Sequence, residues 1–148
     1  MKYIEENRSL RAPSSIERSV LAALRALVPQ RQTTFTEALR VAEQQALRFM
    51  SRFGIQAGPV SEDLLLRLPR IAVEYVERMP TSGCSFWDVE RKSWIIQVNS
   101  SEPPTRQRFT MFHEYKHIVD HGRTDQLYGT GPEASSGSDR HSDTLIGF

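Results

Sequence analysis

Apolar residues in the first half of the chain recur three or four positions apart, which is the spacing of an amphipathic helix. This spacing predicts three helices before residue 70. Each has a polar capping residue at its start and a helix-terminating residue at its end. The predicted helices run from Ser14 or Ser15 to Pro29, from Thr34 or Thr36 to Gly54, and from Ser61 to Pro69.

The pattern then changes to one that is typical of strands. "IAVEYVER" (71–78) alternates between two faces, while "CSFWDV" (84–89) and "WIIQVN" (94–99) are rich in β-branched and aromatic residues. The polar "ERKS" between the last two predicts a hairpin turn. Helices and strands are therefore segregated, and we predict an α+β fold with a small antiparallel three-stranded sheet.

A polar loop containing Pro103 and Pro104 leads into a further helix, which is predicted from Thr105 to the pair His121 and Gly122. A turn-rich segment (129–139) follows, and a C-terminal helix is predicted to begin near residue 139. We expect residues 1–35 to form an N-terminal helical extension and residues 36–148 to form the main domain.

Composition limits the classes of function. A length of 148 residues suits one domain, and a net charge of +1 argues against a protein that mainly neutralises phosphates. Residues 1–35 carry six Lys or Arg against three Glu, which we interpret as a solvated helix face, so direct nucleic-acid binding is not expected. Cys84 is the only cysteine, and we interpret it as a strand residue and not as a nucleophile. With no apolar stretch long enough for a membrane span and no signal peptide, we expect a cytoplasmic protein.

The segment "RFTMFHEYKHIVDHG" (108–122) contains the most informative chemistry. On a helix, His113 and His117 project from one face, where both imidazoles reach one ion at roughly 2.0–2.1 Å. Glu114 lies about 100° around the helix, where it can act as the general base of an HExxH site. The competing interpretation is a solvated helix face, but the apolar residues beside the motif supply the anchoring that a metal site needs; they are Phe109, Phe112, Ile118 and Val119.

A third metal ligand must come from elsewhere. His121 lies about 12 Å along the helix axis from His113, so one ion cannot reach both. We predict Asp139 as the third ligand, although its position also suits a helix cap, and Asp143 or His141 as the replacement. Asp143 is also a candidate for orienting a ligating imidazole. Other acidic residues after the helix are Asp125 and Glu133. The candidate donors to a developing negative charge are Tyr128, Arg140 and His141.

The segment "RQRFTMFHEYKHIVDHG" (106–122) resembles the core of the ImmA/IrrE-type zinc metallopeptidases. The sequences before it are similar to the usual lead-in of that family. They are "EALRVAEQQALRFMSRFGI", "PVSEDLLLRLPRIAVEYV" and a hairpin that ends in "IIQVNSS". The resemblance covers roughly residues 37–148, whereas residues 1–35 lie outside it.

This resemblance implies a gluzincin-like fold with one zinc ion per chain, held by His113 and His117, and Glu114 as the catalytic base. "DRHSDTLI" (139–146) fits the pattern that supplies the third ligand, with Asp139 at the ligand position and Asp143 at the Asn/Asp position. The resemblance also implies a bacterial or phage endopeptidase that cleaves or regulates a helix-turn-helix repressor. Such pairs act in stress responses, mobile-element control and toxin–antitoxin systems.

The chain departs from the family pattern at several positions. Asp139 is one methylene shorter than the usual Glu, and Tyr115 and Lys116 replace small or apolar residues; we expect Lys116 to face solvent. Family members usually continue beyond the position of Phe148, so we expect the domain to be short or truncated at this end. An extended substrate could pair with an exposed strand, for which the strand containing Trp94 is one candidate.

Three alternatives remain open from the sequence. The chain could be a regulatory or toxin–antitoxin interaction protein with a weak or vestigial metal site. It could be a DNA-contacting regulator that acts through the basic N-terminal helix, in which case binding would weaken steeply with salt. The metal could also be a divalent ion other than zinc, since two His and a carboxylate suit several ions.

Overall fold

The computed structural model describes residues 15–129, with side chains from Val20 onward, and its elements follow the predicted α+β order. The elements are α1 (Ser15–Arg25), α2 (Phe35–Arg52), α3 (Asp63–Leu66), β1 (Ile71–Val76), β2 (Gly83–Asp88), β3 (Ser93–Asn99), α4 (Pro104–Asp120) and α5 (Thr124–Tyr128). The short helix α5 was not predicted, and the helix predicted from residue 139 lies outside the described residues.

The N-terminus of α2 forms as its sequence predicts. Thr34 caps the helix: its hydroxyl accepts from the backbone N–H of Glu37 at 3.2 Å, and the Glu37 carboxylate accepts from the N–H of Thr34 at 2.8 Å. This reciprocal pair satisfies two of the backbone donors that a helix start leaves open. At the other end Gly54 has φ 67°, the left-handed conformation that glycine adopts without strain.

The sheet is mixed, and the prediction of an antiparallel sheet was wrong for β1. The strand order is β1-β3-β2; β3 pairs antiparallel with β2 through the predicted turn but parallel with β1. A parallel pair needs a connection of a dozen or more residues, and residues 77–92 provide it, with β2 inside the connection. Local alternation of side chains predicts a strand but not the direction of its neighbour.

Strand β3 lies in the centre of the sheet. Ile95, Ile96 and Val98 are all buried, which is typical of a strand covered on both faces. The strand that contains Trp94 is therefore not the edge that an extended peptide could join, and that interpretation was wrong. The edges of the sheet are β1 and β2.

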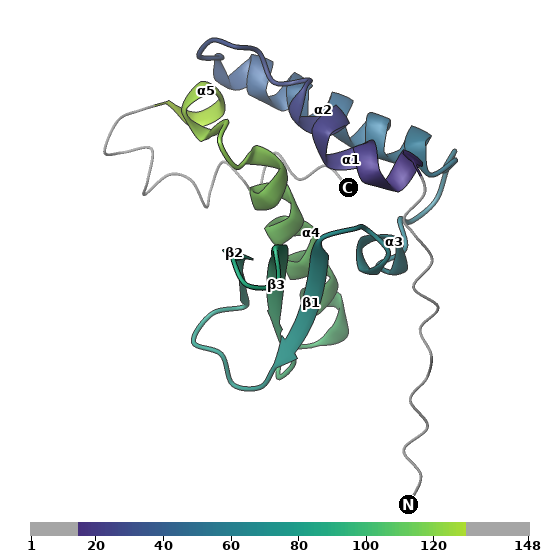
Figure 1. Cartoon of the computed structure of the whole chain (residues 1–148), viewed down its shortest axis with the longest axis vertical. Coiled ribbons are helices and arrows are strands. Elements are labelled where there is room, and N and C mark those ends of the chain that lie inside the picture. Colours follow the sequence, from purple (N-terminus) through teal and green to yellow (C-terminus); the bar gives the residue numbers. More distant parts are fainter. Residues whose placement is uncertain (1–14, 130–148) are drawn as a thin grey trace, which may run out of the picture.

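The main core lies between the sheet and the helices. Figure 1 shows α4 running along one face of the sheet and reaching α1 and α2 beyond the ends of the strands. The helix α1 contributes Val20 and Leu24 to the same core as Tyr115 and Ile118 of α4. No helix within residues 15–129 has both the length and the apolar character that a membrane span requires.

Candidate metal centre

Helix α4 carries the candidate site, and its sequence fixes both its start and its orientation. Pro104 occupies the first turn, where its missing N–H is no loss and its fixed φ suits the helix. Met111, Tyr115 and Ile118 are at most 1% exposed and anchor one face of the helix in the core. Because this face is fixed, the opposite face presents His113 and His117, both of which are half-buried.

The last turn of α4 is held by a side chain from α1. Arg25 donates from Nε to the carbonyl oxygen of Val119 at 3.2 Å and from Nη2 to that of Ile118 at 2.6 Å. These carbonyls belong to the group that a helix C-terminus leaves without intrahelical partners, and a cation is favoured there. Gly122, with φ 78°, follows the end of the helix. Arg25 therefore holds the last turn of α4, which carries His117, and the chain leaves the helix at Gly122.

The two imidazoles already converge. The Nε2 atoms of His113 and His117 are 3.0 Å apart, and their ring planes are inclined at 77°. Two nitrogen ligands at 2.0–2.1 Å from one tetrahedral zinc ion lie about 3.3 Å apart. The observed distance is close to that value, so the pair fits one metal ion with only a small adjustment.

Glu114 completes this group. One ligand atom from each of His113, Glu114 and His117 can be chosen so that all of them lie within 4.8 Å of one another, and Glu114 is 9% exposed. Burial, and then the negative charge of Glu114, raise the pKa of the Cys84 thiol on β2. A raised pKa makes Cys84 a poorer nucleophile, and the influence of Glu114 shows that β2 lies near the site.

Strand β2 also touches α4 directly. A Cβ at Gly83 would lie 2.5 Å from the Thr110 side chain and 2.5 Å from the Gln97 carbonyl oxygen. Only a glycine allows this close approach between strand and helix. The edge strand β2 is therefore held close to the helix that carries His113 and Glu114.

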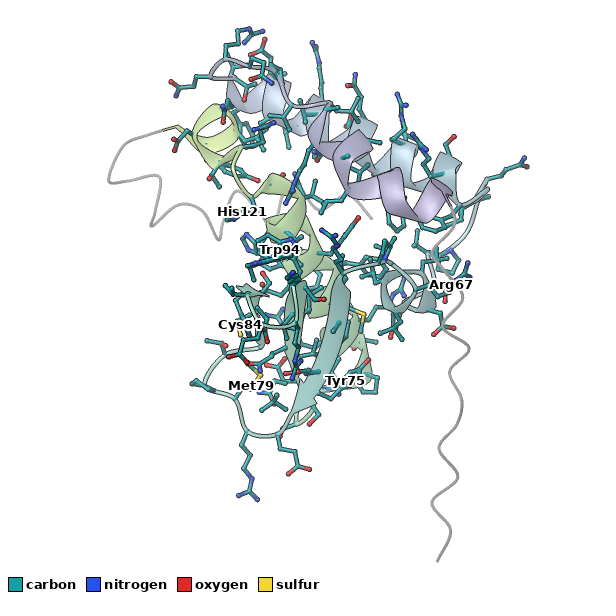
Figure 2. The ribbon with its side chains drawn as sticks, in the orientation of Figure 1. Arg67, Tyr75, Met79, Cys84, Trp94 and His121 are labelled. Carbon is teal, nitrogen blue, oxygen red and sulfur yellow. The ribbon has the colours of Figure 1, made fainter. Side chains whose placement is uncertain are left out.

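The other candidate ligands are placed differently. His121 is exposed, and its ring packs edge-on against Trp94 at 4.8 Å between centroids; Figure 2 labels both residues near the end of α4. Neither His121 nor the exposed Asp125 belongs to the group that His113, Glu114 and His117 form within residues 15–129. Four predicted site residues and one further acidic candidate lie outside the described residues: Asp139, Arg140, His141, Asp143 and Glu133.

Lys116 does not face solvent, and that expectation was wrong. Its side chain is 3% exposed and donates to Asp120 Oδ1 at 2.7 Å and to Gln45 Oε1 of α2 at 2.9 Å. The Gln45 amide in turn donates to the carbonyl oxygen of Leu24 at 3.2 Å. The buried ammonium is thus paired and hydrogen-bonded, as a charge inside a protein must be.

Tyr128 joins the same network. Its hydroxyl donates to Asp120 Oδ2 at 2.6 Å, which connects α5 to the end of α4. Sequence reasoning did not identify this network, although Lys116 and Asp120 have the i, i+4 spacing that brings opposite charges together on a helix. The spacing alone does not show that the pair is buried.

Two histidines with a glutamate between them, on a helix beside the edge strand of a small sheet, define an HExxH metallopeptidase. The comparison with known families agrees. Residues 69–140, just under half of the chain, match the family Peptidase_M78, described as the IrrE N-terminal-like domain. The matched segment is therefore a domain of the ImmA/IrrE metallopeptidase family, which confirms the resemblance seen in the sequence. No curated protein and no solved structure matches the chain.

Proposed function

We propose that this protein is a zinc-dependent endopeptidase, and that His113, His117 and Asp139 hold one zinc ion. The observation that carries the proposal is the 3.0 Å approach of the two Nε2 atoms, with the Glu114 carboxylate in the same group. Zinc prefers nitrogen and carboxylate ligands of this kind. The carboxylate of Asp139 is proposed from the sequence pattern, because that residue lies outside the described part of the chain.

Glu114 is proposed as the general base. The metal, when bound, supplies Lewis acidity that polarises the scissile carbonyl and lowers the pKa of water. The Glu114 carboxylate accepts a proton from the attacking water and then delivers it to the leaving amine. Its low exposure excludes bulk water from around this carboxylate, which strengthens its electrostatic interactions.

A donor to the developing negative charge is also needed. Tyr128, Arg140 and His141 are the proposed candidates. For Tyr128 this role requires an exchange of partners, because its hydroxyl donates to Asp120 at 2.6 Å. Asp143 is proposed to orient a ligating imidazole through its free N–H.

We further propose that an extended substrate pairs with β2. This strand is an edge of the sheet, and Gly83 keeps it close to α4. Burial and then the negative charge of Glu114 raise the pKa of Cys84 in this strand, which supports a position of the strand near the proposed base. Main-chain hydrogen bonds to an edge strand bind a peptide with little dependence on its sequence.

The proposed substrate is a helix-turn-helix repressor of a bacterial or phage stress, mobile-element or toxin–antitoxin system, as the resemblance to the ImmA/IrrE-type enzymes implies. The alternative is an interaction protein whose metal site is weak or vestigial. A buried glutamate beside the histidine pair favours the enzyme, because a purely structural site has no use for a general base.

The replacement Glu114→Gln separates these two functions. We expect zinc-loaded wild-type protein to cleave a helix-turn-helix repressor that is encoded by a neighbouring gene. The cleavage products would be identified by mass spectrometry. The variant should retain its zinc and lose roughly 10²-fold or more of the cleavage rate, because the proton acceptor is gone. The matched control is Glu43→Gln, which alters an exposed glutamate on α2 and should leave the rate unchanged.

Cleavage by Glu114→Gln at the wild-type rate would contradict the proposed role of Glu114. A wild-type protein that binds the repressor without cleaving it would support the interaction protein instead.

A further inference from the structure

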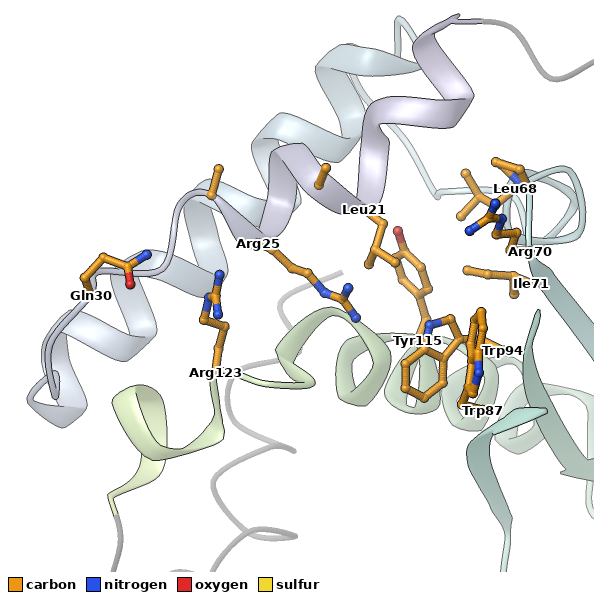
Figure 3. Close-up of a pocket in the computed structure, with 13 residues that line it drawn as sticks. Leu21, Arg25, Gln30, Leu68, Arg70, Ile71, Trp87, Trp94, Tyr115 and Arg123 are labelled. Carbon is orange, nitrogen blue, oxygen red and sulfur yellow. The ribbon is translucent and has the colours of Figure 1, made fainter. Parts of the chain in front are cut away.

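A cavity lies on the side of α4 away from the two histidines. It has a volume of about 1000 Å³ and opens between α1, the end of α4 and the first residues of β1 and β3, and none of the metal-group residues lines it. Figure 3 shows the Tyr115 ring reaching from α4 toward Leu21 of α1 inside this cavity. The charged and aromatic side chains that line it are Arg25, Arg70, Arg123, Trp87, Trp94 and Tyr115.

The charged side chains from the described residues that line the cavity are all positive. Three arginines line it, and no lining residue from the described part of the chain is acidic. Burial, and then the positive charge of Arg123, lower the pKa of Arg25, so these two guanidinium groups lie close enough to disfavour each other. The negative charge of Asp120 acts in the opposite direction on the pKa of Arg25. An anion beside Arg25 and Arg123 would further reduce the repulsion between them.

Two buried polar atoms in the lining also lack hydrogen bonds. The Tyr115 hydroxyl and Arg123 Nε are both shielded from water and find no hydrogen-bond partner within the described residues. The side chain of Tyr115 is about 1% exposed. Because the large majority of buried side-chain polar atoms in native proteins are hydrogen-bonded, an unpaired hydroxyl beside a cationic cavity points to a ligand that accepts a hydrogen bond from it.

The cavity also offers aromatic surface. Trp87 and Trp94 meet edge to face, with 5.5 Å between their ring centroids, and Trp87 is 40% exposed. Ligand pockets of this size combine apolar and aromatic walls with a few polar groups that fix the orientation of the ligand.

We propose that this cavity binds a small organic anion that carries a flat ring, with its anionic group beside Arg25, which Figure 3 shows between Arg123 and Tyr115, and its ring against Trp87 and Trp94. A mononucleotide and an aromatic carboxylate share this chemistry. The proposal concerns the full chain and is independent of the metallopeptidase function, because no lining residue belongs to the metal group.

Binding can be read directly, because Trp87 and Trp94 are the only tryptophans in the chain. The probes are adenosine monophosphate and benzoate, added to zinc-loaded and to chelator-treated full-length protein. Inorganic phosphate and adenosine are the anion-only and ring-only controls. We expect saturable changes in tryptophan fluorescence, confirmed by calorimetry, for at least one probe in both protein preparations. The probe that binds more tightly shows whether the ligand is a mononucleotide or an aromatic carboxylate.

Two variants test the named contacts. Arg123→Gln should weaken binding of the tighter probe by about tenfold or more, because charge-assisted hydrogen bonds are lost. Tyr115→Phe should weaken it about threefold or more while leaving thermal unfolding unchanged or raised, because the hydroxyl has no partner within the described residues. Arg48→Gln, which changes an exposed arginine of α2, is the control and should bind normally.

Three results would overturn the proposal: neither probe binds the wild type, phosphate alone binds as tightly as both probes, or both cavity variants bind like the wild type.

Discussion

Lys116 lies between two residues of the candidate site in sequence, yet its ammonium group is buried on another side of the helix. It contacts Asp120 and Gln45, and the ion pair is 3% and 1% exposed at its two ends. Removing one partner of such a pair leaves the other charge buried and uncompensated. The stability of α4 therefore depends on a charge pair beside the metal group but separate from it.

We predict that Lys116→Met lowers the free energy of unfolding by about 3–5 kcal/mol, measured by urea denaturation. The double variant Lys116→Met with Asp120→Asn should recover part of this loss, because the remaining side chain is neutral and still accepts from Tyr128. A single variant as stable as the wild type would show that the pair contributes nothing.

At the scale of single residues, the sequence was sufficient to predict that His113, Glu114 and His117 lie close together, because the fixed geometry of one helix places all three. It did not show that Lys116 is buried, because burial depends on the distant residue Gln45. The role of Tyr128 likewise depends on α5, a helix too short for any periodic pattern to predict.

Among the elements, β2 and α4 are joined at one close contact. Gly83 leaves no room for a side chain between the Gln97 carbonyl oxygen and Thr110. A methyl group there would move the edge strand away from the helix that carries Glu114. The position of β2 therefore requires a glycine at residue 83 because no side chain fits there. The backbone angle φ of Gly83 is not the reason.

We predict that Gly83→Ala lowers the melting temperature by several degrees and raises the KM for peptide cleavage, because β2 is displaced from the site. Adding Thr110→Ala should restore only part of the stability, since the contact with the backbone oxygen of Gln97 remains. Unchanged stability and KM in the single variant would contradict this packing.

The start of α2 gives a prediction about pH. The Arg31 guanidinium, followed by the N–H of Thr34, lowers the pKa of Glu37 from 4.5 to about 2. A carboxyl group with a lowered pKa in the folded state stabilises the protein above its unfolded pKa and loses this effect as pH falls through the folded value. Glu37→Gln should therefore lower the melting temperature at neutral pH, and the difference should shrink between about pH 4.5 and pH 2. A difference that does not change over this window would contradict the assignment.

The order of the elements from α1 to α4 along the chain was predicted correctly, but the pairing of one strand was not. Alternation and turn residues located all three strands, and capping residues located the start of α2. The parallel pairing of β1 with β3 was not predicted, because it depends on where a long connection places β2. The buried run Ile95 and Ile96 was the available signal for a central strand.

Across the whole molecule, α4 is held by contacts from the sheet and from three other helices. The sheet packs on it, Arg25 of α1 binds its last carbonyls, Gln45 of α2 receives Lys116, and α5 is joined through Asp120. A site with its groups held in this way pays little reorganisation when a ligand binds. Binding of a metal to the folded state alone should then stabilise the whole domain.

The most direct test of the account is the zinc content of purified, tag-free protein, wild type beside His117→Ala. The account predicts about one zinc per wild-type chain and a wild-type melting temperature that rises when zinc is added. Both effects should be lost in His117→Ala, with its fold checked by circular dichroism. Wild-type protein that binds no zinc after the metal is supplied, or His117→Ala protein that binds it equally well, would contradict the proposed metal centre.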